Sequence, residues 1–331
     1  MTARPRAPRP RPAQLAVSAL ASAAALALLA ACATSEPVAS ADTPESAAPA
    51  GTRTVDTAFG EVDLPADPQA ALGVYTTDID MLVTLGVPLA GKQPIRGDGY
   101  TAFPSFFDQE ALAEVETFEN FPEYNYEEML NAAPDVILNG LGYDEDLVAK
   151  LPEIAPTYSY DGFDGGDWRD RFAEIAVAFD REAEHDAWLE KYEAKVAEVR
   201  AALDAADVHP VVAPVGYWDG SVTASCYGMP CLVFKDLGLE IPAYADSWDG
   251  TVYALEQVES LGDIDVMFAS AVPDADGTIP DPFAEISDNA LWAALPAVSS
   301  GNVVRYDMEM NYGSPSGQYA FLEAVEKALL P

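Results

Sequence analysis

The sequence predicts an α/β protein of two lobes, each with a mainly parallel sheet flanked by helices, joined by one long interlobe helix. Short β-branched segments such as Val136-Ile137-Leu138 alternate with helical segments in both halves of the chain, which is typical of βαβ units. In the middle, Trp188, Tyr192 and Val199 fall on one helical stripe. The predicted division is an N-terminal lobe over residues 53–180, an interlobe helix over 181–206 and a C-terminal lobe over 207–331.

The elements of the N-terminal lobe follow from local patterns. Apolar and polar residues alternate around Gly60, which predicts a hairpin, and Gly86 closes a helix that Thr77 or Asp78 can cap. The expected strands and helices are a hairpin over 54–64, strands at 71–75, 87–91, 136–138 and 156–160, and helices at 78–85, 144–151 and 167–179.

The C-terminal half repeats this alternation after His209-Pro210. Its apolar runs are short and bounded by Gly, Pro or Ser, as expected for buried strands. The expected strands are 211–215, 266–269 and 303–306, and the expected helices are 231–237, 255–260, 290–294 and 318–330.

Charge excludes several functions. The chain has 331 residues, half of them apolar, and a formal charge of −38. Residues 1–31 hold four arginines and no acid, so the remainder carries 55 acids against 13 bases, a net −42. Such a surface repels phosphate backbones and anionic lipid headgroups, which argues against nucleic-acid binding and against attachment through a basic face. Two histidines also make a His-rich metal site improbable, and no metal site is expected.

The N-terminus has the pattern of an export signal. A basic start and an apolar run over 15–31 precede Leu29-Ala30-Ala31-Cys32. That tetrapeptide resembles the lipobox of bacterial lipoproteins, which implies lipid attachment at Cys32; a plain signal peptide or an uncleaved anchor are the alternatives. Residues 32–52 are rich in Ala, Ser, Pro and Thr and predict a disordered tether.

The two remaining cysteines, Cys226 and Cys231, lie five residues apart. In an exported protein the default is a local disulfide. A thiolate metal site is the alternative, but the sequence offers no second Cys or His pair to complete it.

Motifs for catalysis fail on inspection. Gly140-Leu141-Gly142 lacks the third glycine of a dinucleotide loop, and the central position of Gly313-Ser-Pro-Ser-Gly317 is proline, which excludes a nucleophile elbow. We therefore expect no enzyme. An exported α/β hydrolase and a wall-interaction module stay as alternatives.

Four segments in order resemble the class III substrate-binding lipoproteins of ABC importers, which deliver iron–siderophores, haem or cobalamin. They are Phe59-Gly-Glu-Val-Asp-Leu-Pro65, residues 78–87, residues 125–138 with Pro134-Asp135, and residues 295–306. The resemblance implies a monomer that needs no cofactor, holds its ligand between the lobes and docks on the permease through one acid from each lobe. The matching positions are Glu127 and Glu256.

Ligand-binding residues are expected in loops after strand ends. Aromatic rings suit the apolar faces of a ferric chelate and arginine suits its oxygens. With only 13 bases in the body, a hydroxamate siderophore fits better than a catecholate; haem or cobalamin is the alternative cargo within the family. The candidates are Tyr75, Arg96, Tyr100, Tyr143, Tyr217, Trp218, Trp248, Arg305 and Tyr312.

Overall fold

The computed structural model describes residues 51–97 and 99–330. The predicted signal peptide, the lipidation position Cys32 and nearly all of the predicted tether lie outside this range. No helix within the described range is both long and apolar enough to cross a membrane.

The N-terminal lobe holds small parallel sheets. After the antiparallel hairpin β1 (Thr52–Thr57) and β2 (Gly60–Pro65), three strands pair in parallel in the order β3-β6-β7. Two further strands, β4 and β5, pair in parallel beside them. The bounds are β3 Ala71–Gly73, β4 Lys92–Ile95, β5 Glu116–Glu119, β6 Val136–Asn139 and β7 Thr157–Ser159. The helices are α1 Thr76–Thr84, α2 Tyr126–Asn131, α3 Glu145–Lys150 and η1 Leu151–Glu153.

A side chain joins β3 to β4. The prediction of a strand at 87–91 is wrong. Only Leu89 forms an isolated bridge in that segment, and strand β4 begins at Lys92. The buried Gln93 amide donates to the carbonyl oxygens of Ala71 and Ala90, at 2.8 and 3.2 Å, and its oxygen accepts from Gly73 N at 2.9 Å. Gln93 thus supplies hydrogen bonds that a strand ladder would otherwise make.

The C-terminal lobe has one five-stranded sheet in the order β10-β9-β8-β11-β12. Strands β8, β11 and β12 are parallel, whereas β9 and β10 extend the sheet on the other side of β8 with antiparallel pairing. The strands are β8 Val212–Trp218, β9 Ser221–Ala224, β10 Thr251–Ala254, β11 Val266–Ala271 and β12 Val303–Asp307. The helices are α6 Pro230–Leu237, η2 Leu255–Leu261, η3 Ala284–Ile286, α7 Ala290–Ala293, α8 Pro296–Ser299, η4 Met308–Asn311 and α9 Pro315–Leu329.

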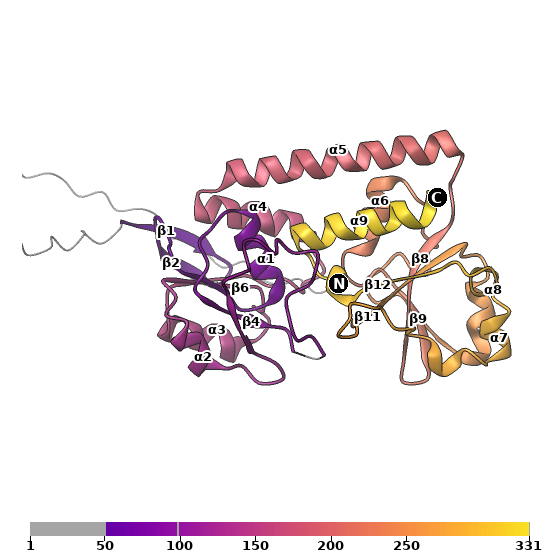
Figure 1. The fold of residues 1–331 in the computed structure, drawn as a ribbon, viewed down its shortest axis with the longest axis horizontal. Coiled ribbons are helices and arrows are strands. Elements are labelled where there is room, and N and C mark those ends of the chain that lie inside the picture. Colours follow the sequence, from indigo (N-terminus) through magenta and orange to yellow (C-terminus); the bar gives the residue numbers. More distant parts are fainter. Residues whose placement is uncertain (1–50, 98, 331) are drawn as a thin grey trace, which may run out of the picture. The chain divides into compact units, whose positions relative to one another are not determined.

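Helices α4 (Trp168–Phe179) and α5 (Glu182–Ala206) connect the lobes, and α5 runs beside α4, α6 and α9 (Figure 1). Asp167 caps the start of α4 by accepting from Arg169 N, and Asp180 ends it with a positive φ of 59°. The largest buried cluster contains side chains of both lobes, among them Leu138, Trp188, Phe268 and Phe321. The lobes therefore share one continuous core under α5.

A candidate ligand cleft between the lobes

Two cavities meet where the lobes face each other. The first has a volume of about 220 Å³ and is lined by both lobes. The second, of about 330 Å³, is lined by the N-terminal lobe and by Tyr312. Phe163 and Tyr312 line both, with ring centroids 5.9 Å apart. We treat the two cavities as chambers of one cleft.

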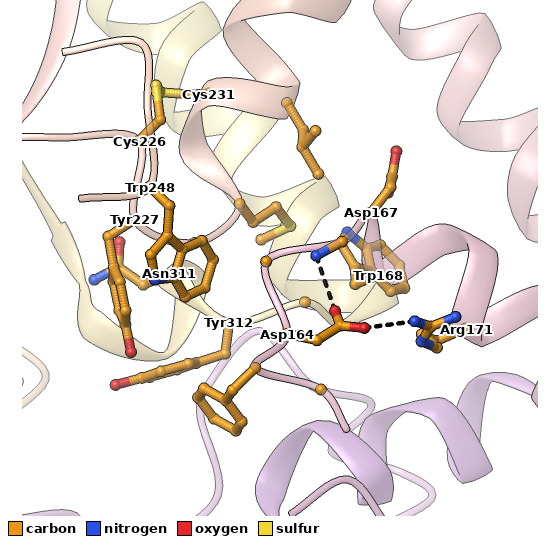
Figure 2. A pocket seen from close by; sticks show the side chains of 18 of the residues that line it. Asp164, Asp167, Trp168, Arg171, Cys226, Tyr227, Cys231, Trp248, Asn311 and Tyr312 are labelled. Atoms are coloured by element: carbon orange, nitrogen blue, oxygen red, sulfur yellow. Dashed lines mark hydrogen bonds and ion pairs between the residues drawn. A yellow bond between two sulfur atoms is a disulfide. The ribbon is translucent and has the colours of Figure 1, made fainter. Parts of the chain in front are cut away.

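Aromatic side chains of the C-terminal lobe form one wall of the first chamber. The rings of Tyr227 and Trp248 lie 4.6 Å apart between centroids, with Tyr312 beside them (Figure 2). Cys226 N donates to the carbonyl oxygens of Ala245 and Ser247, at 2.8 and 2.9 Å. These bonds hold the loop before Trp248 against the loop that carries Tyr227.

The disulfide between Cys226 and Cys231 closes the loop that carries Tyr227, with Cα atoms 5.4 Å apart. Inside it, Gly228 has φ +78°, and an added Cβ would lie 2.1 Å from the carbonyl oxygen of Asn311. Met229 N donates to that same oxygen at 2.9 Å. Only glycine fits this close approach, which positions the Tyr227 loop beside the segment that ends in Tyr312.

The second chamber is organised around Arg96. Its Nη1 donates to Tyr75 Oη at 2.7 Å and to Glu309 Oε1 at 3.1 Å, and its Nη2 donates to Tyr312 Oη at 2.9 Å. The guanidinium also lies 4.6 Å from the centroid of the Tyr312 ring, within cation–π range. Arg96 and Tyr75 come from the N-terminal lobe, and Glu309 and Tyr312 from the C-terminal lobe.

Glu309 is a buried acid with its partners from the other lobe. Its side chain is 1% exposed, and Thr76 Oγ1 donates to its second oxygen at 2.8 Å. Burial raises the pKa of Glu309, while the Arg96 charge and the hydrogen bonds from Thr76 and Arg96 lower it. Burial and the Glu309 charge also raise the pKa of Tyr75, so its hydroxyl stays neutral and can accept from Arg96.

Asp78 shapes the N-terminal side of the cleft. It is fully buried and accepts from Tyr160 Oη at 2.7 Å, Tyr75 N at 3.0 Å and Gly140 N at 3.1 Å. Burial raises its pKa to about 6, although these hydrogen bonds favour the charged form. Asp78 thereby ties the start of α1 to the loop after β6.

The first chamber carries no excess of positive charge. Its acids are Asp161, Asp164, Asp167 and Asp246, and its bases are Arg171 and Lys235. Arg171 pairs with Asp164 and Lys235 pairs with Asp246, each at 2.6 Å. Arg96 in the second chamber is likewise paired with Glu309. The charged groups of the cleft are therefore balanced or slightly acidic.

The structure brings five of the nine predicted ligand-binding residues to the cleft, namely Tyr75, Arg96, Tyr143, Trp248 and Tyr312. Tyr100 is instead buried, and its hydroxyl donates to Asp307 Oδ1 at 2.5 Å. Arg305 is exposed on β12 and lines neither chamber. Trp218, which is 84% exposed, and Tyr217 border a separate surface hollow.

The sequence analysis did not single out the cleft residues Phe163, Asp164, Arg171 and Tyr227, nor Glu309, the buried partner of Arg96. Tyr227 had a usable signal, because it lies inside the short loop between two cysteines. Glu309 had none, since its partner Arg96 is 213 residues away.

The two predicted docking acids are both exposed, and each lies in the first turn of its helical element, Glu127 in α2 and Glu256 in η2. Across the described residues, no group of three or more His, Cys, Asp or Glu is placed to hold a metal ion.

The comparisons with known proteins agree with this architecture. A family model described as periplasmic binding protein matches residues 74–310, most of the described chain. The protein therefore belongs to the periplasmic binding protein family. A search of curated proteins gives no match.

Solved structures place the fold more closely. A periplasmic solute binding protein from Mycobacterium smegmatis aligns with TM-score 0.67 and 23% identity, covering 84% of this chain and 98% of that one. SirA from Staphylococcus aureus complexed with staphyloferrin B aligns with TM-score 0.62 and 21% identity, covering 83% of this chain and 97% of that one. FhuD from Vibrio cholerae with bound Fe3+-Desferal aligns with TM-score 0.62 and 23% identity, covering 79% of this chain and 98% of that one. The predicted class III binding-protein fold is confirmed.

Proposed function

We propose that this protein captures a ferric siderophore, of the hydroxamate type, in the interlobe cleft and delivers it to the permease of an ABC importer. The observation that carries the proposal is the meeting of Tyr75, Arg96, Tyr143, Trp248 and Tyr312 around two adjoining cavities. Rings of this kind pack on the apolar faces of a chelate, while a guanidinium donates to its oxygens.

Similar proteins support the class of cargo. SirA was solved with staphyloferrin B and the Vibrio FhuD with Fe3+-Desferal, and both share the fold. The combined cavity volume also suits a compact chelate held between two lobes.

Charge favours a neutral or cationic chelate. Arg96 is already paired with Glu309, and the first chamber holds four acids against two bases. A ferric tris-catecholate is strongly anionic and would meet little compensating charge here. A ferric hydroxamate, neutral or cationic, avoids this cost.

Delivery would use the exposed acids of both lobes. Glu127 and Glu256 occupy corresponding first-turn positions, and we propose that they pair with arginines of the permease. Cys32 would carry the lipid that holds the chain, as a monomer, at the outer face of the cell membrane.

Equilibrium dialysis of the purified chain against ferrioxamine B, a ferric catecholate, haem and cobalamin tests the cargo. We expect saturable binding of ferrioxamine B, weakened at least about tenfold in Trp248→Ala. Trp218→Ala is the matched control, because it removes an exposed tryptophan outside the cleft.

If the chain binds haem or cobalamin more tightly than ferrioxamine B, that ligand replaces the ferric siderophore as the proposed cargo. If a folded chain binds none of the four ligands, the transport proposal is refuted. An exported hydrolase or a wall-interaction module would then be favoured instead.

A further inference from the structure

Trp218 is the most exposed large hydrophobic residue of the described chain, at 84%. It ends β8, and the turn to β9 consists of Asp219 and Gly220, whose φ angles are +47° and +76°. Positive φ at both positions is the signature of a tight two-residue hairpin turn. The backbone under Trp218 is therefore firmly placed, and its ring is held out into solvent by the hairpin.

Strand pairing connects Trp218 to the start of η2. Trp218 is paired with Ser221 across the hairpin, and Ser221 is paired with Ala254 on β10. Paired residues of an antiparallel sheet share a face. Val252, 62% exposed, lies two residues back on that same face of β10. Ala254 immediately precedes η2, whose first turn carries Glu256.

The surface beside Trp218 is hollow and acidic. A depression of about 850 Å³ is bordered by Tyr217, Trp218 and Asp219 on the hairpin and by Asp281 and Glu285 on the facing segment. The segment that supplies the facing side of this hollow is also strongly acidic. Residues 236–304 include 13 Asp or Glu and no Lys or Arg. The hollow therefore attracts cations.

We propose that this surface, formed by Trp218, Asp219, Asp281 and Glu285 and here named the Trp218 surface, binds an arginine-bearing extracytoplasmic loop of the permease. The inference rests on the proposed transport function and extends its docking site beyond Glu256. A guanidinium stacks on an indole face and pairs with carboxylates, and tryptophan and arginine are both enriched among the residues that carry most of the binding energy at protein interfaces.

Charge disfavours the other occupants. A second copy of the chain joined by a two-fold axis would bring the same acidic surface against itself. Anionic lipid headgroups would be repelled by the same carboxylates.

Site-specific photo-crosslinking in cells tests the contact directly. The full-length chain carries p-benzoylphenylalanine in place of Trp218 or, as the control, in place of Phe59, an exposed aromatic of the β1–β2 hairpin. We expect crosslinking to a permease subunit from position 218 only. Its yield should fall about fivefold or more when Asp219→Asn, Asp281→Asn and Glu285→Gln are combined. Crosslinking to no membrane protein, or equally from both positions, overturns the proposal.

Iron uptake by cells, compared with the Kd of the purified chain, distinguishes docking on the permease from capture of the ligand. In cells that carry Trp218→Ser as their sole copy, uptake of radiolabelled iron from ferrioxamine B should fall about tenfold or more. The purified variant should keep the wild-type Kd, and Phe59→Ser should leave both unchanged. Wild-type uptake by Trp218→Ser cells overturns the docking inference alone. If the wild-type chain binds no ferric siderophore yet crosslinks to a permease from position 218, the cargo proposal fails and the docking surface stands.

Discussion

Replacing Glu309 with glutamine removes the buried acid that joins the lobes through Arg96. The Arg96 side chain is 13% exposed and that of Glu309 only 1%, so the arginine would keep its charge in a largely dry site. Removing one partner of a buried ion pair costs about 3–5 kcal/mol. Arg96 retains the hydroxyls of Tyr75 and Tyr312 as acceptors. The expected loss in the free energy of unfolding is therefore near the lower end of this range, about 3 kcal/mol.

The same variant should change ligand preference. The substitution removes one negative charge from the site, and a change of one unit charge about 10 Å from a charged chelate contributes about 1.7 kcal/mol at an effective dielectric constant near 20, or more than tenfold in affinity. Glu309→Gln should therefore bind ferric citrate more tightly and ferrioxamine B more weakly than the wild type.

Urea unfolding at pH 7 measures the first effect, and equilibrium dialysis measures the second. A double-mutant cycle with Arg96→Met isolates the contribution of the pair. When Arg96 is absent, Glu309→Gln should no longer change the preference between chelates of different charge. A loss of stability below about 1 kcal/mol, typical of exposed pairs, would refute this reading of the interlobe contact. So would an unchanged preference between the two chelates.

Three further predictions concern other parts of the molecule. Burial raises the pKa of Asp80 to about 6, so the folded chain holds this proton more tightly than the unfolded one; this group should lower stability by up to about 3 kcal/mol as pH rises from about 4 to 6, and Asp80→Asn should reduce the slope in urea titrations while the part due to Asp78 remains. Replacing Cys226 and Cys231 with serine should lower the unfolding free energy by about 2 kcal/mol and weaken ligand affinity, whereas equal affinity would show that the disulfide does not shape the chamber. Glu127→Ala and Glu256→Ala should reduce iron uptake in cells while leaving the Kd of the purified chain unchanged, and a loss of affinity instead would contradict a docking role.

Amphipathic and β-branched patterns were enough to predict the elements with strong local signals. The stripe that contains Trp188 and Tyr192 predicted α5, and Val136-Ile137-Leu138 predicted β6. Strand β4 was displaced in the prediction, because its sequence holds Lys92, Gln93 and Pro94 and its attachment to β3 depends on a side-chain amide. Such a tertiary hydrogen bond leaves no periodicity in the sequence.

The rule that ligand residues follow strand ends led to Tyr75 and Arg96, which follow parallel strands and line the second chamber. It did not bring Trp218 to the cleft, because β8 turns back into the antiparallel β9 and its end becomes a hairpin tip. Asp219-Gly220 was the available signal, since this dipeptide favours a two-residue hairpin. Interlobe partners such as Glu309 require the folded chain to be known.

Helix α9 (Pro315–Leu329) packs against both lobes and so links their folding. Within α9, Phe321, Leu322 and Val325 are fully buried in the core that both lobes share. At its start, Ser316 N donates to Asp80 at 2.7 Å, and Gln318 accepts from Trp168 at 2.5 Å. Without α9, the core that both lobes share would be open to water. The two lobes therefore complete this shared core together, at the step in which α9 packs against them.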